Sequence, residues 1–314
     1  MADLLRPRAV PPGGIIGLAA PAGPVDPERL AQGEARLRES GFEVVRGDDI
    51  VARQGYLAGD DERRARELMD LVGDPRVDAI VCVRGGYGCQ RILDKLDASA
   101  VRRAAKPLVG YSDVTTLLCW QQEVAGLGGL HGPMLERKGG FDPVALDSLC
   151  QALLGEDAGR VLGGRAVRGG AAEGVLCGGS LSMVVASLGT PWEIETRDRV
   201  LLLEEVNEAP YRIDRMLHHL RAAEKLKGVL GVGVGALVNC GAADDEGPRA
   251  EDVVCEVLDS LDVPLVLDLP FGHLGENHPW PTGGRARLDG ERGDLTLLEA
   301  STDGSDVSRS GVSR

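Results

Sequence analysis

The chain has 314 residues, of which 43% are hydrophobic, 27% charged and 3% aromatic, which is enough for one large or two ordinary globular domains and excludes disorder as the main state. The net charge of −14 repels phosphate backbones and anionic lipid surfaces, and three Trp, four Tyr and three Phe offer few platforms for stacked bases. We therefore expect no nucleic-acid and no membrane partner.

The cellular compartment is predicted from what the chain lacks. Residues 1–14 contain no apolar run of signal-peptide length, and no later stretch is long and apolar enough to span a bilayer. The seven cysteines are dispersed and never spaced as Cys-x-x-Cys, so neither a disulfide framework nor a structural zinc site is expected. These features are typical of a cytoplasmic protein with reduced cysteines.

Strand and helix patterns alternate along the first half of the chain. The predicted strands are 14–19, 42–46, 77–83 and 107–109, and the predicted helices are 26–41, 60–72, 90–96, 114–125 and 143–154. The strands are rich in Val, Ile and Leu with little polar alternation, which indicates burial on both faces. The pattern predicts a Rossmann-like α/β domain over residues 8–154, with a parallel sheet, helices on both faces and functional loops at the carboxyl ends of the strands.

A second, smaller α/β domain is predicted over residues 172–302. It contains helices near 181–188, 211–223 and 250–261, strands at 200–204, 229–239 and 264–269, and a hairpin over 286–298. Residues 155–171 are rich in Gly, Arg and Ala and are predicted to be the interdomain linker. Residues 303–314 are predicted to be a disordered tail.

Ser112 is a candidate nucleophile because it lies between an apolar strand and a helix. In Gly110-Tyr111-Ser112-Asp113 the hydroxyl is placed on a tight strand-to-helix turn, and the amide of Asp113 can face a developing oxyanion. The glycine that usually follows two residues after such a serine is replaced by Val114. Helix capping is the competing interpretation, and the local pattern alone favours it.

A glycine-rich segment, Arg84-Gly85-Gly86-Tyr87-Gly88, follows a strand at the same edge of the predicted sheet. Glycine permits close backbone approach, so the amide of Gly85 or Gly86 is a candidate second oxyanion donor. Arg84 is a candidate for binding an anionic part of the substrate. The spacing matches neither a Walker loop nor a dinucleotide fingerprint, and a plain turn is the alternative.

His273 is the best-placed general base among five histidines because it follows a strand. His131 could line a pocket, whereas His218 and His219 are adjacent on a helix and are expected at a surface. His273 and His278 lie close to Glu276, but the spacing is not that of a zinc-binding helix, so no metal is expected.

A histidine base needs a carboxylate on its other ring nitrogen. Glu204 continues the apolar run Leu201-Leu202-Leu203, where a carboxylate requires a partner, whereas Glu205 is expected to face solvent. A salt bridge from Glu204 to Arg212 or Arg215 is the alternative.

Together these segments resemble the LD-carboxypeptidase family of serine peptidases, which includes the microcin C immunity proteins. The resemblance covers nearly the whole chain and is carried by six ordered motifs: residues 19–23, 84–88, 110–113, 178–181, 203–205 with 211–215, and 271–273. It implies a Ser112–Glu204–His273 triad, with the serine on the first domain and the other two residues on the second.

The resemblance also implies a function. Family members are typically cytoplasmic homodimers that use no metal or other cofactor and remove the terminal D-alanine from murein tetrapeptides during peptidoglycan recycling. The segment 278–283 departs from the family pattern through His278, Pro279 and Trp280, which puts the substrate in question and leaves His278 as an alternative to His273 as the base. One alternative is a microcin C immunity-like hydrolase of acyl-adenylate analogues, with Trp192 or Trp280 stacking on adenine. Another is a non-catalytic small-ligand binding protein on the same scaffold.

Overall fold

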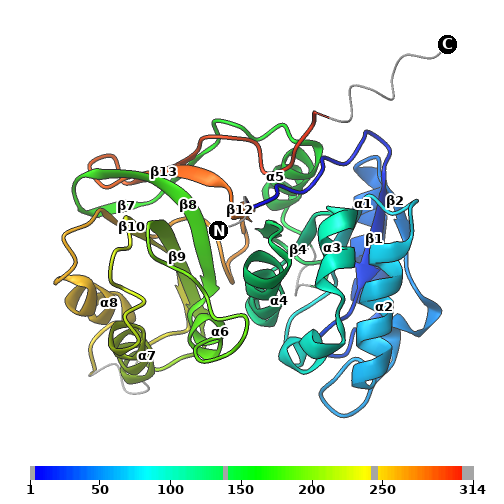
Figure 1. Ribbon diagram of the computed structural model, residues 1–314, viewed down its shortest axis with the longest axis horizontal. Coiled ribbons are helices and arrows are strands. Elements are labelled where there is room, and N and C mark those ends of the chain that lie inside the picture. Colours follow the sequence, from blue (N-terminus) through cyan, green and yellow to red (C-terminus); the bar gives the residue numbers. More distant parts are fainter. Residues whose placement is uncertain (1–3, 137–140, 242–246, 306–314) are drawn as a thin grey trace.

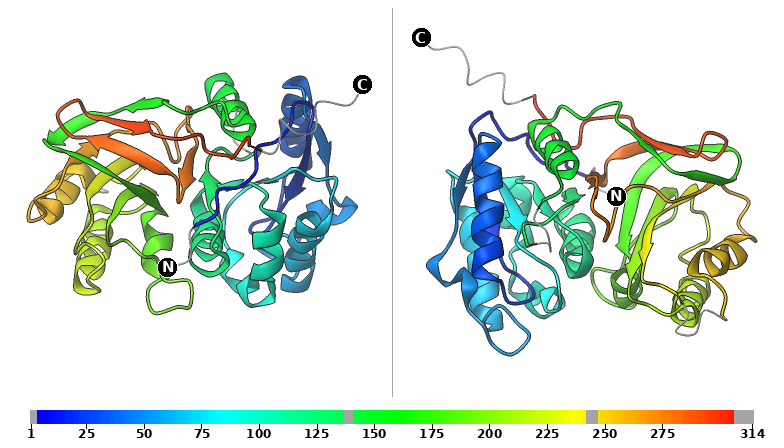
Figure 2. Two further views of the ribbon diagram at one scale, coloured as in Figure 1. Left: turned by 45° about the horizontal axis from the view of Figure 1, so that its top comes forward. Right: turned by 180° about the vertical axis from the view of Figure 1, so that it is seen from behind.

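The computed structural model describes residues 4–136, 141–241 and 247–305. Two sheets, each with its own helices, lie side by side (Figure 1), and the two further views in Figure 2 show the same arrangement. The first half of the chain, coloured blue through cyan to green, builds one layered unit, and most of the second half builds the other.

The first sheet has the strand order β12-β5-β4-β3-β1-β2. Its neighbours pair in parallel, except for the antiparallel pair of β12 and β5. Their bounds are β1 (Ile15–Ala19), β2 (Glu43–Val45), β3 (Ala79–Cys82), β4 (Leu108–Gly110), β5 (Gly129–His131) and β12 (Trp280–Thr282). The parallel Rossmann-like sheet is thus confirmed: β1 to β5 are joined by crossovers, and β3, β4 and β5 are buried on both faces, whereas the edge strand β2 is partly exposed.

Helices cover both faces of this sheet. They are α1 (Pro27–Glu39), α2 (Asp61–Gly73), α3 (Ala98–Ala104), α4 (Thr115–Trp120) and α5 (Pro143–Leu154). Leu30 and Leu149 belong to the apolar cluster on one face, and Leu68 and Leu117 belong to the cluster on the other. The predicted helix 90–96 forms a 3₁₀ helix, Cys89–Lys95, and the predicted helix 114–125 ends in a π turn, Gln121–Ala125.

The second sheet has the order β6-β14-β13-β8-β9-β10-β11-β7. Strands β8 to β11 pair in parallel, and the outer strands pair antiparallel. Their bounds are β6 (Val161–Gly163), β7 (Arg165–Arg168), β8 (Ala171–Ser180), β9 (Arg199–Val206), β10 (Gly231–Val238), β11 (Leu265–Leu267), β13 (Arg285–Asp289) and β14 (Asp294–Leu297).

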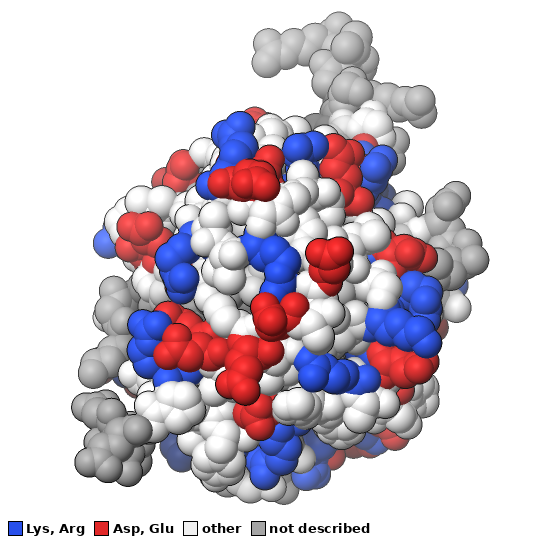
Figure 3. Space-filling view, turned by 90° about the vertical axis from the view of Figure 1, so that its left-hand side faces the viewer, with Lys and Arg blue, Asp and Glu red and all other residues white. Residues whose placement is uncertain are grey.

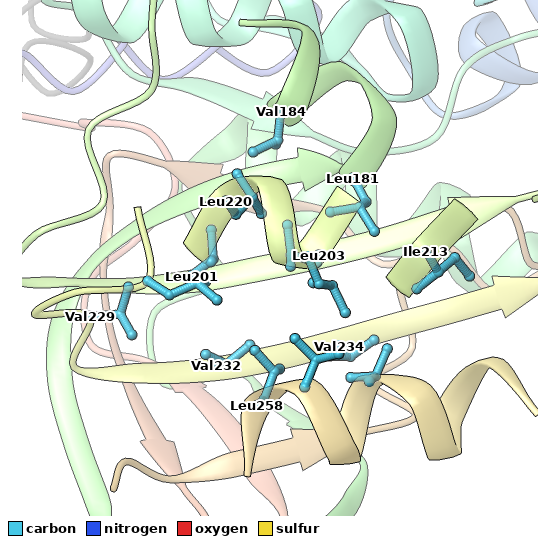
Figure 4. Close-up of a cluster of buried hydrophobic side chains, with 14 of the residues drawn as sticks. Leu181, Val184, Leu201, Leu203, Ile213, Leu220, Val229, Val232, Val234 and Leu258 are labelled. Atoms are coloured by element: carbon cyan, nitrogen blue, oxygen red, sulfur yellow. The ribbon is translucent and has the colours of Figure 1, made fainter. Parts of the chain in front are cut away.

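Three helices pack on one face of the second sheet: α6 (Leu181–Ala186), α7 (Pro210–Ala222) and α8 (Ala250–Leu258). Figure 4 shows Leu201 and Leu203 among side chains from these helices. Leu202 belongs instead to the cluster on the opposite face. Because side chains alternate along a strand, β9 is buried on both sides, which explains its unbroken leucines.

The predicted linker and tail differ from the observed chain. Residues 155–171 contain β6 and β7, which pair with β14 and β11. Both are short edge strands with mostly exposed side chains, so they carry little hydrophobic signal. Asp303, expected in the tail, donates its amide to the carbonyl of Pro7 at 2.7 Å, whereas residues 306–314 lie outside the described residues.

Strand β12 ties the two units together. It lies between the helices and strands of the second unit in the sequence, yet it pairs with β5 of the first sheet, with Trp280 opposite His131. Trp280 is fully buried and packs with Phe271. The loop between β11 and β12 is therefore fixed to the first unit at its end.

The surface of the second unit carries acidic and basic side chains intermixed (Figure 3). Many pair with each other, such as Arg249 with Asp252 at 2.8 Å. This pairing moderates the repulsion that a net charge of −14 imposes on the folded chain.

In the part of the chain that the structure describes, no helix combines the length and the apolar composition needed to cross a membrane.

Candidate active site

Ser112 lies on a strained turn. Strand β4 ends at Gly110, Tyr111 is extended, and Ser112 has a φ of +60°, in the left-handed region that non-glycine side chains disfavour. Gly110 allows the turn to be tight, because a Cβ there would lie 2.6 Å from Cγ1 of Val114. Neither the 3₁₀ turn Ser112–Val114 nor α4 is capped by a side-chain hydrogen bond, which argues against the capping interpretation.

The glycine-rich loop after β3 packs directly on Ser112. A Cβ on Gly85 would lie 3.0 Å from both Cβ and Oγ of Ser112 and 3.5 Å from the amide nitrogen of Asp113. Gly86 has a φ of +116°. The buried carboxylate of Asp113 accepts the amide of Cys89 at 2.8 Å and so joins the loop to the serine turn. This arrangement gathers the amides proposed for an oxyanion hole beside the hydroxyl.

We expect Gly85→Ala to lower the rate of a reaction at the Ser112 hydroxyl by about 10- to 100-fold, because the new methyl group displaces the Ser112 side chain or the amide of Asp113. Steady-state kinetics on the purified variant tests this. Gly73→Ala is the matched control, since a Cβ there meets nothing within 4 Å and the backbone is helical. Equal rates for the two variants would contradict the assigned role of Gly85.

The buried Glu204 and the partly exposed His273 form a pair in the second unit. Oε2 of Glu204 lies 2.7 Å from Nδ1 of His273, and Glu204 is fully buried in β9. Gly272, with a φ of +105°, permits this approach, because a Cβ there would lie 2.7 Å from the same oxygen. Asn277 accepts the Gly272 amide at 2.8 Å and holds the loop. A carboxylate on Nδ1 leaves Nε2 available as a base.

His273 reaches across to the first unit. Its ring lies edge-on to the ring of Tyr111, with the centroids 4.8 Å apart, and Tyr111 is the residue before Ser112. The units also meet where the Ser180 amide donates to Oγ1 of Thr115 at 3.2 Å. The ring of His273 therefore contacts the residue that precedes Ser112, at the interface where the two units meet.

His131 is a buried histidine that is not part of the Glu204–His273 pair. It stacks on Trp280 at 4.9 Å, and neither ring nitrogen has a hydrogen-bond partner among the described residues. Burial, together with the charge of His273, lowers the pKa of His131 to about 3. His131 is therefore neutral near pH 7 and a poor proton acceptor.

The depressed pKa of His131 predicts acid sensitivity. The unfolded chain binds a proton at this histidine below about pH 6.5, whereas the folded chain binds it only near pH 3, so stability falls as the pH drops between these values. At pH 5 this costs about 2 kcal/mol. Urea unfolding at pH 7.5 and pH 5 should show a smaller loss for His131→Phe than for the exposed control His218→Phe. Equal losses would contradict this account.

The other histidines lie elsewhere. His278, the competing base, has its Nδ1 2.7 Å from Oγ of Ser148 on α5, and burial lowers its pKa. His218 and His219 are exposed on α7, as predicted. No cluster of three or more His, Cys, Asp or Glu residues suited to a metal occurs in the described residues.

The expectation for Glu205 is wrong. Glu205 is buried and accepts the amides of Ser182 at 2.7 Å and Val206 at 2.8 Å, because β9 is enclosed on both faces. Burial raises the pKa of Glu205. The alternative partners for Glu204 are not observed: within the described residues neither Arg212 nor Arg215 forms an ion pair with Glu204, and Arg212 pairs with Glu208 at 3.3 Å on the exposed side of α7.

Arg84 lines an open hollow at the surface, together with Arg53 and Tyr56. Its Nη1 donates to the carbonyl of Pro24 at 2.8 Å, and its Nε lies 3.7 Å from Oε2 of Glu136. The side chain is 38% exposed. Sequence reasoning missed the neighbours Arg53 and Tyr56, which lie on a segment without a recognisable motif.

Comparison with known proteins identifies the family. Residues 16–132 match the LD-carboxypeptidase N-terminal domain, and residues 173–288 match the LD-carboxypeptidase C-terminal domain. The chain belongs to the LD-carboxypeptidase family. It is therefore a serine carboxypeptidase and a hydrolase.

Several relatives match over nearly their full length. A probable murein peptide carboxypeptidase of Bacillus subtilis is 34% identical, covering 90% of this chain and 91% of that protein. A murein tetrapeptide carboxypeptidase of Pseudomonas aeruginosa is 31% identical, covering 89% and 94%. The crystal structure of a muramoyltetrapeptide carboxypeptidase from Oxalobacter formigenes has a TM-score of 0.81 at 28% identity, covering 90% and 97%.

The fold is also shared with a microcin self-immunity protein. The microcin C7 self-immunity protein MccF, solved in complex with aspartyl sulfamoyl adenosine, has a TM-score of 0.85 at 22% identity, covering 96% of this chain and 99% of that chain. At this identity the likeness establishes that the two proteins share a fold.

Proposed function

We propose that this LD-carboxypeptidase hydrolyses the amide bond that joins the terminal D-alanine to murein tetrapeptide, in peptidoglycan recycling. The observation that carries the proposal is the Glu204–His273 pair lying against Tyr111, next to the strained Ser112. The names of the relatives from Pseudomonas aeruginosa and Oxalobacter formigenes support this substrate.

The proposed reaction proceeds through an acyl-enzyme. His273 takes the proton of the Ser112 hydroxyl as its oxygen attacks the scissile carbonyl carbon, and the amides of Asp113 and Gly85 or Gly86 stabilise the oxyanion. The C–N bond then breaks, and the His273 imidazolium gives its proton to the leaving D-alanine amine. Water, deprotonated by His273, hydrolyses the ester and restores Ser112, while Glu204 orients the ring and stabilises its charge.

The direct test is release of D-alanine. Purified protein is incubated with murein tetrapeptide, and free D-alanine and tripeptide are measured by mass spectrometry. Equimolar appearance of the two products supports the proposal. Absence of tetrapeptide cleavage, in protein shown to be folded by circular dichroism, would refute the substrate.

A hydrolase of acyl-adenylate analogues is the second candidate. Trp280 does not favour it, because this side chain is fully buried against His131. Trp192 favours this second candidate, because it is half-buried and packs at the edge of the same apolar cluster as Tyr111. Incubation with aspartyl sulfamoyl adenosine separates the two functions, since only this second activity would release aspartate from it.

We also propose that the protein is a cytoplasmic homodimer, as the family resemblance implies. Analytical ultracentrifugation of the full chain tests the dimer, because the monomer has a mass of 33.1 kDa and a dimer twice that value. A single species at the monomer mass across micromolar concentrations would refute it.

A further inference from the structure

An open hollow lies beside the proposed nucleophile. It encloses about 580 Å³ and is lined by Gly23, Pro24, Arg53, Tyr56, Arg84, Gly86 and Tyr87. Gly86 follows Gly85, whose own side-chain position would lie 3.0 Å from Oγ of Ser112. Gly86, which lines the hollow, thus directly follows the residue that packs on the hydroxyl used in the proposed mechanism.

The hollow is cationic in a strongly acidic chain. Nε of Arg53 donates to the carbonyl of Gly55 at 3.2 Å, and Nη1 of Arg84 donates to that of Pro24. Each guanidinium has five N–H donors, so most of them remain for a ligand. Among the described residues no carboxylate lies within 4.0 Å of Arg53, and Glu136 is the one acid that close to Arg84.

Glu136 offsets part of the charge of Arg84. Its oxygen lies 3.7 Å from Nε, beyond hydrogen-bond distance, and burial raises the pKa of its carboxyl group. None of the seven lining residues is acidic. Two guanidinium groups with free donors are suited to a carboxylate, which pairs with arginine through two parallel hydrogen bonds.

Two tyrosines form the outer wall of the hollow. The rings of Tyr56 and Tyr87 meet edge to face with centroids 5.6 Å apart, and these residues are 65% and 48% exposed. Large aromatic side chains that pack on each other at the mouth of a hollow offer apolar surface to the aliphatic part of a ligand. The hollow therefore combines anion-binding and apolar surfaces.

We propose that this hollow is the subsite for the free carboxylate of the terminal residue, with Arg53 and Arg84 as the specificity-determining residues. The inference rests on the proposed function and deepens it. In the leaving residue, three bonds separate the carboxylate carbon from the scissile carbonyl carbon. A receptor for that carboxylate must therefore lie near the nucleophile, and Arg84 directly precedes Gly85, the residue that packs on Ser112.

This subsite accounts for removal of one residue from the chain end. A peptide bond inside a longer chain carries a neutral amide where the terminal residue carries a carboxylate. Binding that amide leaves the two guanidinium groups without an anionic partner, so the site discriminates against internal bonds.

The experiment compares murein tetrapeptide with its C-terminal carboxamide. The wild-type protein should have a kcat/KM for the acid at least about 100-fold above that for the amide, because charge-assisted hydrogen bonds are the stronger ones. In Arg53→Gln and Arg84→Gln this ratio should fall by about tenfold each, and in the double variant it should approach 1. Arg66→Gln, an exposed arginine on α2 that pairs with Asp49, is the control and should keep the wild-type ratio.

The affinities of the Ser112→Ala protein for the acid and for the carboxamide, measured by calorimetry, give the same comparison without turnover. Tighter binding of the acid that disappears in the Arg53→Gln, Arg84→Gln background supports the subsite. A full acid preference in the double variant, or equal treatment of acid and amide by the wild type, overturns it. The proposed function fails differently, by tetrapeptide hydrolysis that survives Ser112→Ala or by no hydrolysis of either peptide.

Discussion

Ser112→Ala should lower kcat/KM for release of D-alanine by about four to six orders of magnitude. The variant keeps the backbone turn but removes the oxygen that forms the ester, leaving binding and the oxyanion donors to act on water alone. Its midpoint of urea unfolding should stay close to that of the wild type, because Ser112 caps neither the 3₁₀ turn nor α4.

Ser99→Ala is a suitable control, since Ser99 is exposed on α3. A Ser112→Ala protein that hydrolyses the tetrapeptide at more than a hundredth of the wild-type rate would remove this serine from the mechanism. Covalent labelling answers the non-catalytic alternative: a fluorophosphonate should add its mass to Ser112 in the wild type and leave Ser112→Ala unlabelled. A binding protein on the same scaffold would fail to react in both.

Glu204→Gln should lower kcat/KM by about four orders of magnitude with little change in KM. The amide keeps the shape of the side chain but carries no charge to stabilise the imidazolium, and its NH₂ group can donate to Nδ1 and impose the wrong tautomer. Within the described residues His273 is the one hydrogen-bond partner of this buried carboxylate, so the pair depends on this contact.

Glu205→Gln is a matched control on the same strand. It is equally buried, but its oxygens accept two backbone amides and it does not contact His273. It should lower the free energy of unfolding by about 1–3 kcal/mol, because the NH₂ group of Gln cannot accept one of these two amides and leaves a buried donor without an acceptor, and it should keep kcat within a few-fold of the wild type. Similar activity losses in both variants would show that Glu204 acts through stability.

The position of His278 shows that residues close together in the sequence need not share a site. His273, Glu276 and His278 lie within six residues, which made His278 a competing base. The loop turns between them: Gly272 and Asn277 hold His273 against Glu204, whereas His278 contacts Ser148 on α5. Neighbours along a loop can thus face different units, because the loop is held by contacts at several points.

Patterning along the sequence determined the layers of this protein. Buried strands such as β1 and β3 are continuous runs of apolar residues, and Asp26 and Asp142 cap helices where the chain predicts their starts. The candidate serine, glutamate and histidine also followed from the sequence, since each lies at or near the carboxyl end of a strand of a parallel sheet.

Tertiary structure decided the rest. Strands β6, β7 and β12 are short, and edge strands carry almost no periodic signal; what defines them is a hydrogen-bonded partner far away in the chain. The hollow of Arg53 and Tyr56 was invisible for the same reason, because it forms only where loops from separate strands meet. Local sequence encodes which backbone a segment prefers, whereas long-range packing decides which side chains face each other.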